Sequence, residues 1–395
     1  MTPARARFAE GTLALLISAE CLVNASWRGI MFSPDSVWYV RAGNAVLANH
    51  FDVRAMWTGL FDVFYTLLPL LIAMAKAIAP ASWPPLIILA NTAAIACAGV
   101  LTFRLAYRYV GTTAGVVAAA GFVAGVEIID WSRYILTDSL FLGIVTLATY
   151  LMTVALVDGA PQTAFAAGGV LLVAFVTRPT APQLLAPFAI VLAAMWRVHR
   201  GRADGATEMR RLTLLFLAAI PLLLVLAVAV LTVIVRRHTS VPVLQQVIEL
   251  YRSGVVIAGR PETSSAGGTG FGNLLETLLR RLAAFFSITA KGFSPAHTIA
   301  ATLYSVPLYT AAAAGVLTLL RQRGARPPRE IAAYVALLTA CVIWISQALV
   351  IIDFDWRYRL PAMPPLLLLA SLGVTSLLEA TRHFWRRHVV PSRKS

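Results

Sequence analysis

Long apolar runs separated by short charged segments are the feature that most limits what this chain can fold into. Several runs reach the roughly 17 to 25 residues that a helix needs to cross about 30 Å of hydrocarbon. Charged residues make up only 13% of the 395 residues, whereas an ordinary soluble domain has about 25%. A helix satisfies its own backbone hydrogen bonds in lipid. The sequence therefore predicts an all-α polytopic membrane protein.

The hydropathy pattern predicts about ten transmembrane helices in a single integral membrane domain, residues 1–395. Arginines gather in the connections that this threading places in the cytoplasm, as the positive-inside rule requires, so the net charge of +15 reflects orientation in the membrane and no nucleic-acid partner is expected. Both termini are then cytoplasmic, with a basic tail at 380–395, and the expected location is the inner (plasma) membrane. The predicted spans are 11–31, 84–104, 111–128, 139–157, 163–177, 181–196, 212–235, 297–320, 331–352 and 361–379.

Two long segments are expected outside the membrane, on the face opposite the cytoplasm. The first, 32–83, includes the apolar stretch 65–79, which is too short to span and contains a proline and a lysine. We expect that stretch to lie along the outer interface as a juxtamembrane helix. The second, 236–296, contains a Gly/Ser-rich run that fits either a lid over the acceptor or a plain connector. The basic and then apolar start of the chain fits an uncleaved signal anchor better than a cleaved signal peptide.

Three polar clusters on the predicted outer face are the candidate site. Asp35 follows the first span, with Tyr39 one turn later, and Asp138 opens the fourth span close after Arg133. Tyr39 and Arg133 are the candidate substrate-binding residues of these two clusters. Charged side chains near a membrane are costly and usually functional. The alternative for both acids is helix N-capping, a role that Asp often takes.

The third cluster follows the ninth span and combines acids, arginines and aromatic residues. It holds Asp353 and Asp355 as well as Arg357, Tyr358 and Arg359. The planar guanidinium of arginine pairs well with phosphate oxygens, so this cluster is predicted to bind phosphate. A surface ion-pair network with interfacial anchors is the alternative. Arg178, beside Pro179, is a lesser candidate for the same role.

These motifs, in this order, resemble the GT-C superfamily of integral membrane glycosyltransferases, particularly the branch of the protein O-mannosyltransferases and the lipid A aminoarabinose transferase. The resembling segments span about 30 to 365: 34–36 with Tyr39, the Leu-Leu-Pro-Leu stretch at 67–70, 136–140, 178–180 and 357–361. The resemblance implies that a sugar is transferred from a polyprenyl-phosphate donor to a glycan, lipid or protein acceptor on the outer face, usually with inversion.

The resemblance assigns Asp35 as the catalytic base and Asp138 as the second-loop acid, with Arg357 and Arg359 near the carrier phosphate. Ser36 stands where many relatives have a second acidic residue, so a divalent cation stays open and no metal-ligating residue is assigned. The alternatives from other classes are a transporter or flippase of a lipid-linked sugar and a non-catalytic scaffold. Against transport, charged residues inside the spans are scarce and no inverted repeat is visible.

Overall fold

A computed structural model describes residues 2–57, 62–201, 204–236, 271–288, 294–321, 327–349 and 356–388, which are nearly all helical. The α-helices are α1 (Pro3–Arg28), α2 (Pro34–Ala48), α3 (Leu67–Ile78), α4 (Trp83–Leu105), α5 (Thr112–Val123), α6 (Val126–Asp130), α7 (Asp138–Asp158), α8 (Pro161–Phe175), α9 (Leu185–His199), α10 (Gly205–Arg236), α12 (Phe271–Ala284), α13 (Pro295–Arg321), α14 (Pro327–Leu349) and α15 (Met363–His388). The short turns are η1 (Val53–Met56), η2 (Asp62–Tyr65), η3 (Ala106–Val110), η4 (Trp131–Arg133), η5 (Ala181–Leu184) and η7 (Trp356–Ala362).

Eight helices of the described residues are long and apolar enough to cross a membrane, which confirms the prediction of an all-α multi-pass membrane protein. They are built on α1, α4, α7, α9, α10, α13, α14 and α15. Helix α5 and the turn-rich segment 126–133 are bent by 52° at their junction and make a ninth if they count as one span. Helix α8 is apolar but has only 15 residues. The count of ten spans therefore stays a prediction.

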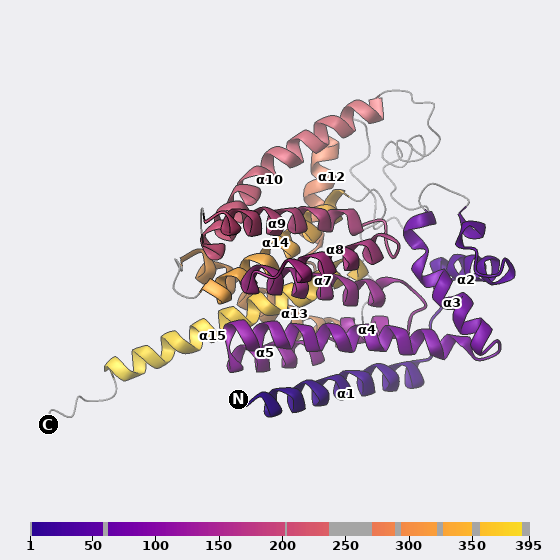
Figure 1. The fold of residues 1–395 in the computed structure, drawn as a ribbon, viewed down its shortest axis with the longest axis horizontal. Coiled ribbons are helices and arrows are strands. Elements are labelled where there is room, and N and C mark those ends of the chain that lie inside the picture. Colours follow the sequence, from indigo (N-terminus) through magenta and orange to yellow (C-terminus); the bar gives the residue numbers. More distant parts are fainter. Residues whose placement is uncertain are drawn as a thin grey trace.

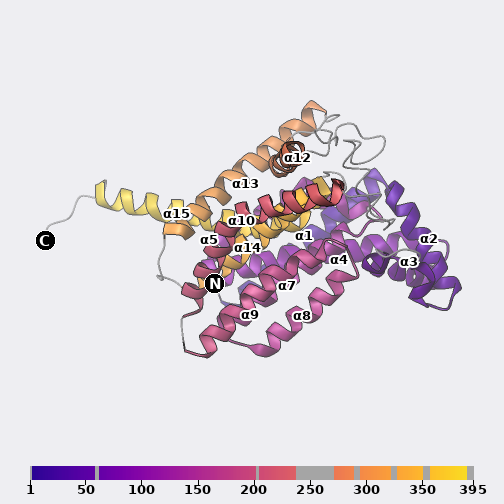
Figure 2. The same cartoon turned by 90° about the horizontal axis from the view of Figure 1, so that it is seen from above.

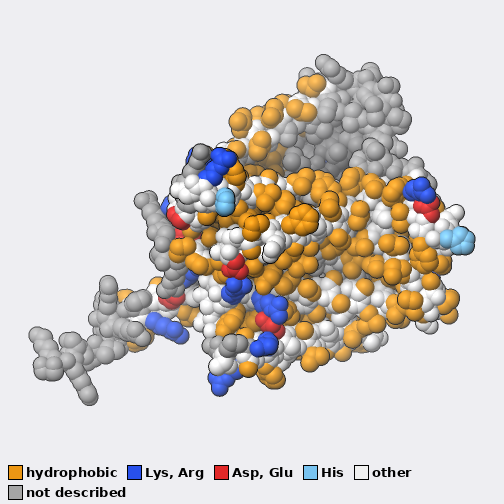
Figure 3. Space-filling model, in the orientation of Figure 1, with side chains coloured by type: hydrophobic (Ala, Val, Ile, Leu, Met, Phe, Trp, Pro, Cys, Tyr) orange, Lys and Arg blue, Asp and Glu red, His pale blue; other side chains and the backbone are white. Residues whose placement is uncertain are grey.

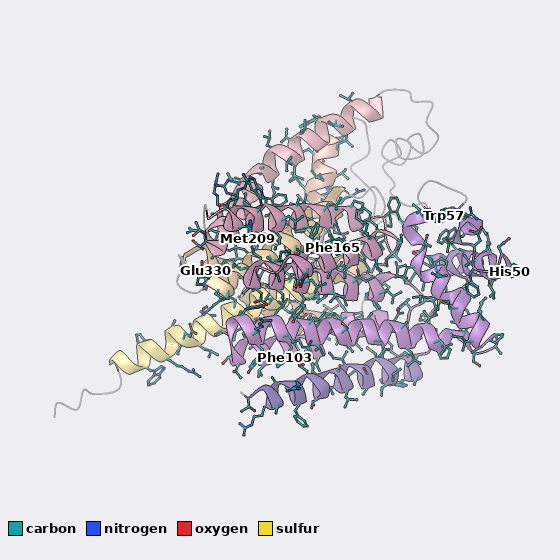
Figure 4. All side chains as sticks on the ribbon, in the orientation of Figure 1. His50, Trp57, Phe103, Phe165, Met209 and Glu330 are labelled. Carbon is teal, nitrogen blue, oxygen red and sulfur yellow. The ribbon has the colours of Figure 1, made fainter. Side chains whose placement is uncertain are left out.

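The long helices lie alongside one another, with both chain ends at one end of the bundle and α2 and α3 at the other (Figure 1). We call the second of these the α2 end. His50 and Trp57 lie there, whereas Met209 and Glu330 lie near the end that holds the termini (Figure 4). Apolar side chains cover most of the visible surface between the two ends (Figure 3).

Helix α14 lies in the middle of the bundle, with α7, α8 and α9 on one side and α13 on the other (Figure 2). It contacts α7, α9, α10, α12, α13 and α15. Helices α14 and α15 are mostly enclosed by protein, while α1 and α10 expose most of their apolar side chains. The contrast is the one expected if α14 and α15 lie at the centre of a membrane bundle and α1 and α10 lie at its rim, because a surface that faces lipid is apolar.

Helices α13 and α15 approach each other closely through glycine. Gly315 and Gly373 face the partner backbone, and a Cβ on Gly373 would stand 2.7 Å from the Gly315 nitrogen and even nearer the Ala311 carbonyl oxygen. Small residues let membrane helices approach closely enough for backbone packing. The glycine pair therefore sets the distance between these two helices.

The short apolar stretch at 65–79 forms α3, a helix of 12 residues, which is too short to span a bilayer. It packs on α2, where Ile72 lies so close to Gly43 that a Cβ there would sit 2.8 Å from the Ile72 side chain. The predicted outer segment 32–83 is thus occupied by a pair of packed helices and two short turns.

Candidate active site

Backbone hydrogen bonds join the segments that carry the predicted site residues. The amide of Met31 donates to the carbonyl of Arg133 (2.9 Å), and the amide of Ile135 donates to the carbonyl of Met31 (3.1 Å). The amide of Leu67, at the start of α3, donates to the carbonyl of Val176 just after α8 (2.9 Å). The first two bonds join the segments that precede α2 and α7, and the third joins the start of α3 to the segment that follows α8.

Asp35 lies in the first turn of α2, and its carboxylate pairs with a residue more than 300 positions away. Arg357 Nη1 donates to Asp35 Oδ2 over 2.8 Å, with side-chain exposures of 12% for Arg357 and 53% for Asp35. The N-cap is Ser33, which forms a capping box with Ser36. The capping alternative is therefore wrong for Asp35, whose carboxylate is committed to Arg357.

Asp138 is the first residue of α7, and its carboxylate accepts a hydrogen bond from Arg178 Nη1. Both side chains are buried, at 2% and 8% exposure. Burial alone would lower the pKa of Arg178, but the Asp138 carboxylate, together with Tyr358 and Tyr39, outweighs this effect and the pKa lies above its ordinary value. Thr137 holds the N-cap position, so Asp138 acts as the counter-ion of a buried arginine rather than as a cap.

Tyr358 connects the two ion pairs. The guanidinium carbons of Arg178 and Arg357 lie 5.0 Å and 5.2 Å from the centroid of its ring, within the range of cation–π attraction. Gln347 of α14 fixes this turn of η7 by donating to the Tyr358 carbonyl over 2.7 Å. Asp35, Arg357, Tyr358, Arg178 and Asp138 thus form one continuous group, which we call the Asp35–Asp138 cluster.

Aromatic side chains of α2 and η2 adjoin this cluster. The ring centroids of Trp38, Tyr39 and Tyr65 lie 5.2 to 5.9 Å apart, with the rings edge to face. Burial raises the pKa of Tyr39, and Tyr65 adds to the effect. Burial also raises the pKa of Tyr65, which Arg178 partly offsets. Tyr39 was predicted as a site residue, whereas the contribution of Tyr65 was missed because no motif marks it.

The raised phenol pKa values predict a loss of stability in alkali. The folded protein holds the protons of Tyr39 and Tyr65 at pH values where the unfolded chain, with an ordinary tyrosine pKa of about 10, releases them. Their contribution is complete below about pH 10 and is lost as the pH rises toward the folded-state pKa. We expect the thermal midpoint to fall above about pH 10, and to fall less steeply in Tyr39→Phe. Parallel curves for the two proteins would contradict this assignment.

Arg133 and Arg359, both predicted to bind substrate, have carboxylate partners outside the cluster. Arg133 Nε donates to Asp130 (2.9 Å), which also accepts from Arg28 (2.6 Å). Arg359 forms a bidentate pair with Glu127. Glu127 and Asp130 were not predicted as partners of these arginines. The sequence signal that could have marked them is a pair of carboxylates three residues apart at the end of an apolar run.

Part of the predicted site lies outside the described residues. This holds for Asp353 and Asp355, and for 237–270 and 289–293 of the predicted acceptor segment 236–296. The rest of that segment contains α12, which packs against α10 and α14. Within the described part of the chain, no group of three or more His, Cys, Asp and Glu side chains is placed to hold a metal ion. A divalent cation therefore stays an open part of the prediction.

Comparisons with known proteins add no relative from which a role could be transferred. No protein-family model matches the chain, and searches of the curated proteins and of the solved structures find no match either. Function is therefore inferred from the geometry of the Asp35–Asp138 cluster and from the sequence motifs that mark its residues.

Proposed function

We propose that this protein is a membrane glycosyltransferase of the GT-C type that transfers a sugar from a polyprenyl-phosphate donor to an acceptor on the outer face of the plasma membrane. The observation that carries this proposal is the Asp35–Asp138 cluster. It places an exposed carboxylate beside two guanidinium groups and several aromatic rings at one end of an apolar bundle. A base, a phosphate-binding group and a sugar-stacking surface are the parts that such a transfer needs.

The proposed topology has ten crossings, with α8 and the bent α5–α6 pair as two of them. Basic side chains occupy the helix ends far from the cluster, including Arg104 at the end of α4, Arg197 at the end of α9 and Arg321 at the end of α13. The positive-inside rule makes that end, with both termini, cytoplasmic. The α2 end is then the outer face, and α3 lies along its interface.

In the proposed reaction Asp35 is the general base. Its carboxylate takes the proton of the acceptor hydroxyl while the acceptor oxygen bonds to the anomeric carbon. The bond from that carbon to the phosphate oxygen breaks, and the carrier phosphate leaves with the electron pair. Arg357 and Arg178 stabilise the charge on the departing phosphate, because preorganised charges act strongly where water is excluded.

The Asp35–Arg357 ion pair gives a reason for donor to bind before acceptor. A phosphate offers Arg357 a bidentate anionic partner, so it competes with the single contact that Asp35 now makes. The carboxylate released in this way is free to act as a base. Asp138 remains bound to Arg178, and its role is to hold that guanidinium in place.

The aromatic side chains suit a sugar ring. Trp38 and Tyr65 are half-buried beside Tyr39, and aromatic faces are well suited to pack against the apolar face of a pyranose or furanose. Both phenols are neutral at physiological pH, because an ordinary tyrosine pKa is about 10 and burial raises the pKa of each further, so their hydroxyl groups can donate hydrogen bonds. The sugar and the acceptor are not specified by these contacts.

The test is transfer of labelled sugar from polyprenyl-phosphate donors by wild-type protein and by Asp35→Asn. We expect the substitution to lower turnover by about 10²- to 10⁴-fold, the usual contribution of a general base, while donor binding persists. Asp52→Asn is the matched control, since Asp52 is another acid of the α2 end, paired with Arg54 in the neighbouring turn. It should retain wild-type turnover.

Two outcomes would overturn the proposal. Equal turnover in wild-type and Asp35→Asn would remove Asp35 from the chemistry. Absence of transfer by the wild-type protein from any of the common polyprenyl-phosphate sugars, with donor lipid instead moving between leaflets of a vesicle, would identify a flippase.

A further inference from the structure

The guanidinium of Arg359, which was predicted to bind phosphate, already contacts several acceptor groups of the protein. Its Nη2 lies 2.6 and 2.8 Å from the two Glu127 carboxylate oxygens, its Nε lies 3.3 Å from Oε2, and its Nη1 donates to the Ser287 carbonyl over 2.6 Å. A longer contact of 3.4 Å reaches the Phe285 carbonyl. The arginine side chain is 1% exposed and that of Glu127 is 12% exposed. The guanidinium is thus enclosed by protein acceptors.

These contacts tie three separate parts of the chain to one residue. Arg359 lies in η7, Glu127 in α6, and the two carbonyls in the segment just after α12. The end of α12 is also held by Trp344 of α14, whose Nε1 donates to the Leu282 carbonyl over 2.9 Å. Aromatic contacts of Phe286 with Tyr309 and Trp344 complete this junction.

Arg359, at the centre of this junction, is two positions after Arg357, the candidate phosphate-binding residue. Arg357, Tyr358 and Arg359 are consecutive in η7, so a shift of Arg359 moves the backbone that carries the other two. Arg357 must reach Asp35, and the Tyr358 ring must lie between two guanidinium groups. A buried ion pair adds little net stability compared with apolar residues of the same size, so its value here is geometric.

We propose that Arg359 is a positioning residue, whose pair with Glu127 and hydrogen bond to Ser287 fix the η7 turn so that Arg357 and Tyr358 are placed for the donor phosphate. The inference rests on the proposed function for its kinetic consequence, but not for its structural one. It replaces the direct phosphate contact expected of Arg359 with an indirect role through its neighbours. It also makes Glu127, in a helix of five residues, part of the support of the site.

The first experiment uses Glu127→Gln in the full-length protein. The amide keeps the shape of the side chain and removes its charge, so the bidentate pair is weakened. We expect the KM for a polyprenyl-phosphate sugar to rise on the order of 10- to 100-fold, the effect of misplacing a binding group by about 1 Å, with a smaller change in kcat. Hydrogen exchange of the 356–362 backbone should become faster than in the wild type.

The matched control is Glu208→Gln. Glu208 is even more buried than Glu127, at 2% exposure, and pairs with Arg197 over 2.8 Å. It precedes Met209, which lies near the opposite end of the bundle (Figure 4). Both substitutions remove one buried carboxylate, so a general loss of stability affects both variants. Only Glu127→Gln should change the KM for the donor and the exchange of 356–362.

A second variant keeps the proposal open to refutation if Glu127→Gln does not fold. In Glu127→Met/Arg359→Met both charges are replaced by flexible apolar side chains, a type of change that buried ion pairs tolerate. We expect a folded protein with a raised KM for the donor and faster exchange at 356–362. Wild-type values of both quantities in either folded variant would overturn the inference. If the wild-type protein transfers no sugar, the proposed function fails, and the exchange result alone decides the role of Arg359.

Discussion

Asp138→Ala is expected to lower the free energy of unfolding by about 3 to 5 kcal/mol, the usual cost of removing one partner of a buried ion pair. The loss is large because Arg178 would stay buried without the carboxylate that now compensates its charge. Denaturant titration of the purified protein in one fixed detergent, followed by tryptophan fluorescence, would measure it. Sugar transfer should be lost as well, since Arg178 would no longer be held beside Tyr358.

Two controls separate charge burial from a general sensitivity to substitution. Asp52→Asn removes the charge of an acid whose arginine partner is highly exposed and keeps a side chain that can cap η1. It should leave the denaturation midpoint unchanged because exposed ion pairs contribute little. Asp138→Leu/Arg178→Met removes both charges and should recover most of the stability without recovering transfer. If Asp138→Ala were as stable as the wild type, Arg178 would not depend on this carboxylate.

Gly373→Ala is expected to destabilise the protein by about 3 kcal/mol or more, at the upper end of the overpacking range. The new methyl group would meet the backbone of α13 at the Ala311 carbonyl and the Gly315 amide nitrogen. Backbone atoms cannot turn away as a side chain does, so α13 and α15 would have to separate. The yield of folded protein in size-exclusion chromatography and its thermal midpoint would report the change.

Gly169→Ala is the matched control for the glycine substitution. Gly169 lies inside α8, and a Cβ there would meet nothing within 4 Å. Alanine is favoured over glycine within a helix by roughly 1 kcal/mol, so this variant should be as stable as the wild type or slightly more so. A similar loss of stability in both variants would show that the close contact of α13 with α15 is not the cause.

The sequence was sufficient for the class of fold and for most members of the cluster. Apolar length predicted spanning helices because the bilayer imposes it, and Asp35, Asp138, Arg178, Arg357 and Tyr358 were all marked by their setting at span ends. Which acid pairs with which arginine was not predictable. That choice depends on how the loops cross, and the Met31 bridge to Arg133 and Ile135 has no signal in the sequence.

Arg359 shows most clearly which contacts could not be predicted from the sequence. Arg359 is the same residue type as Arg357, and both adjoin Tyr358 in the sequence. The Arg359 guanidinium is nevertheless enclosed by Glu127 and two carbonyls, whereas that of Arg357 contacts the exposed carboxylate of Asp35. In a helical turn, residues two positions apart point in different directions. The packing of α6 and of the segment after α12 around η7 decides which of the two arginines is enclosed.

The ion pair between Asp35 and Arg357 also constrains the biogenesis of the protein. Its partners are 322 positions apart, so a ribosome adding about 5 to 20 residues per second needs roughly 16 to 64 s to make the second after the first. During that interval the earlier helices are already entering the bilayer, while Asp35 lacks the arginine with which it pairs in the folded protein. The Asp35–Asp138 cluster is thus completed only after η7 has been synthesised, and a nascent chain that stalls before η7 lacks the guanidinium that pairs with Asp35.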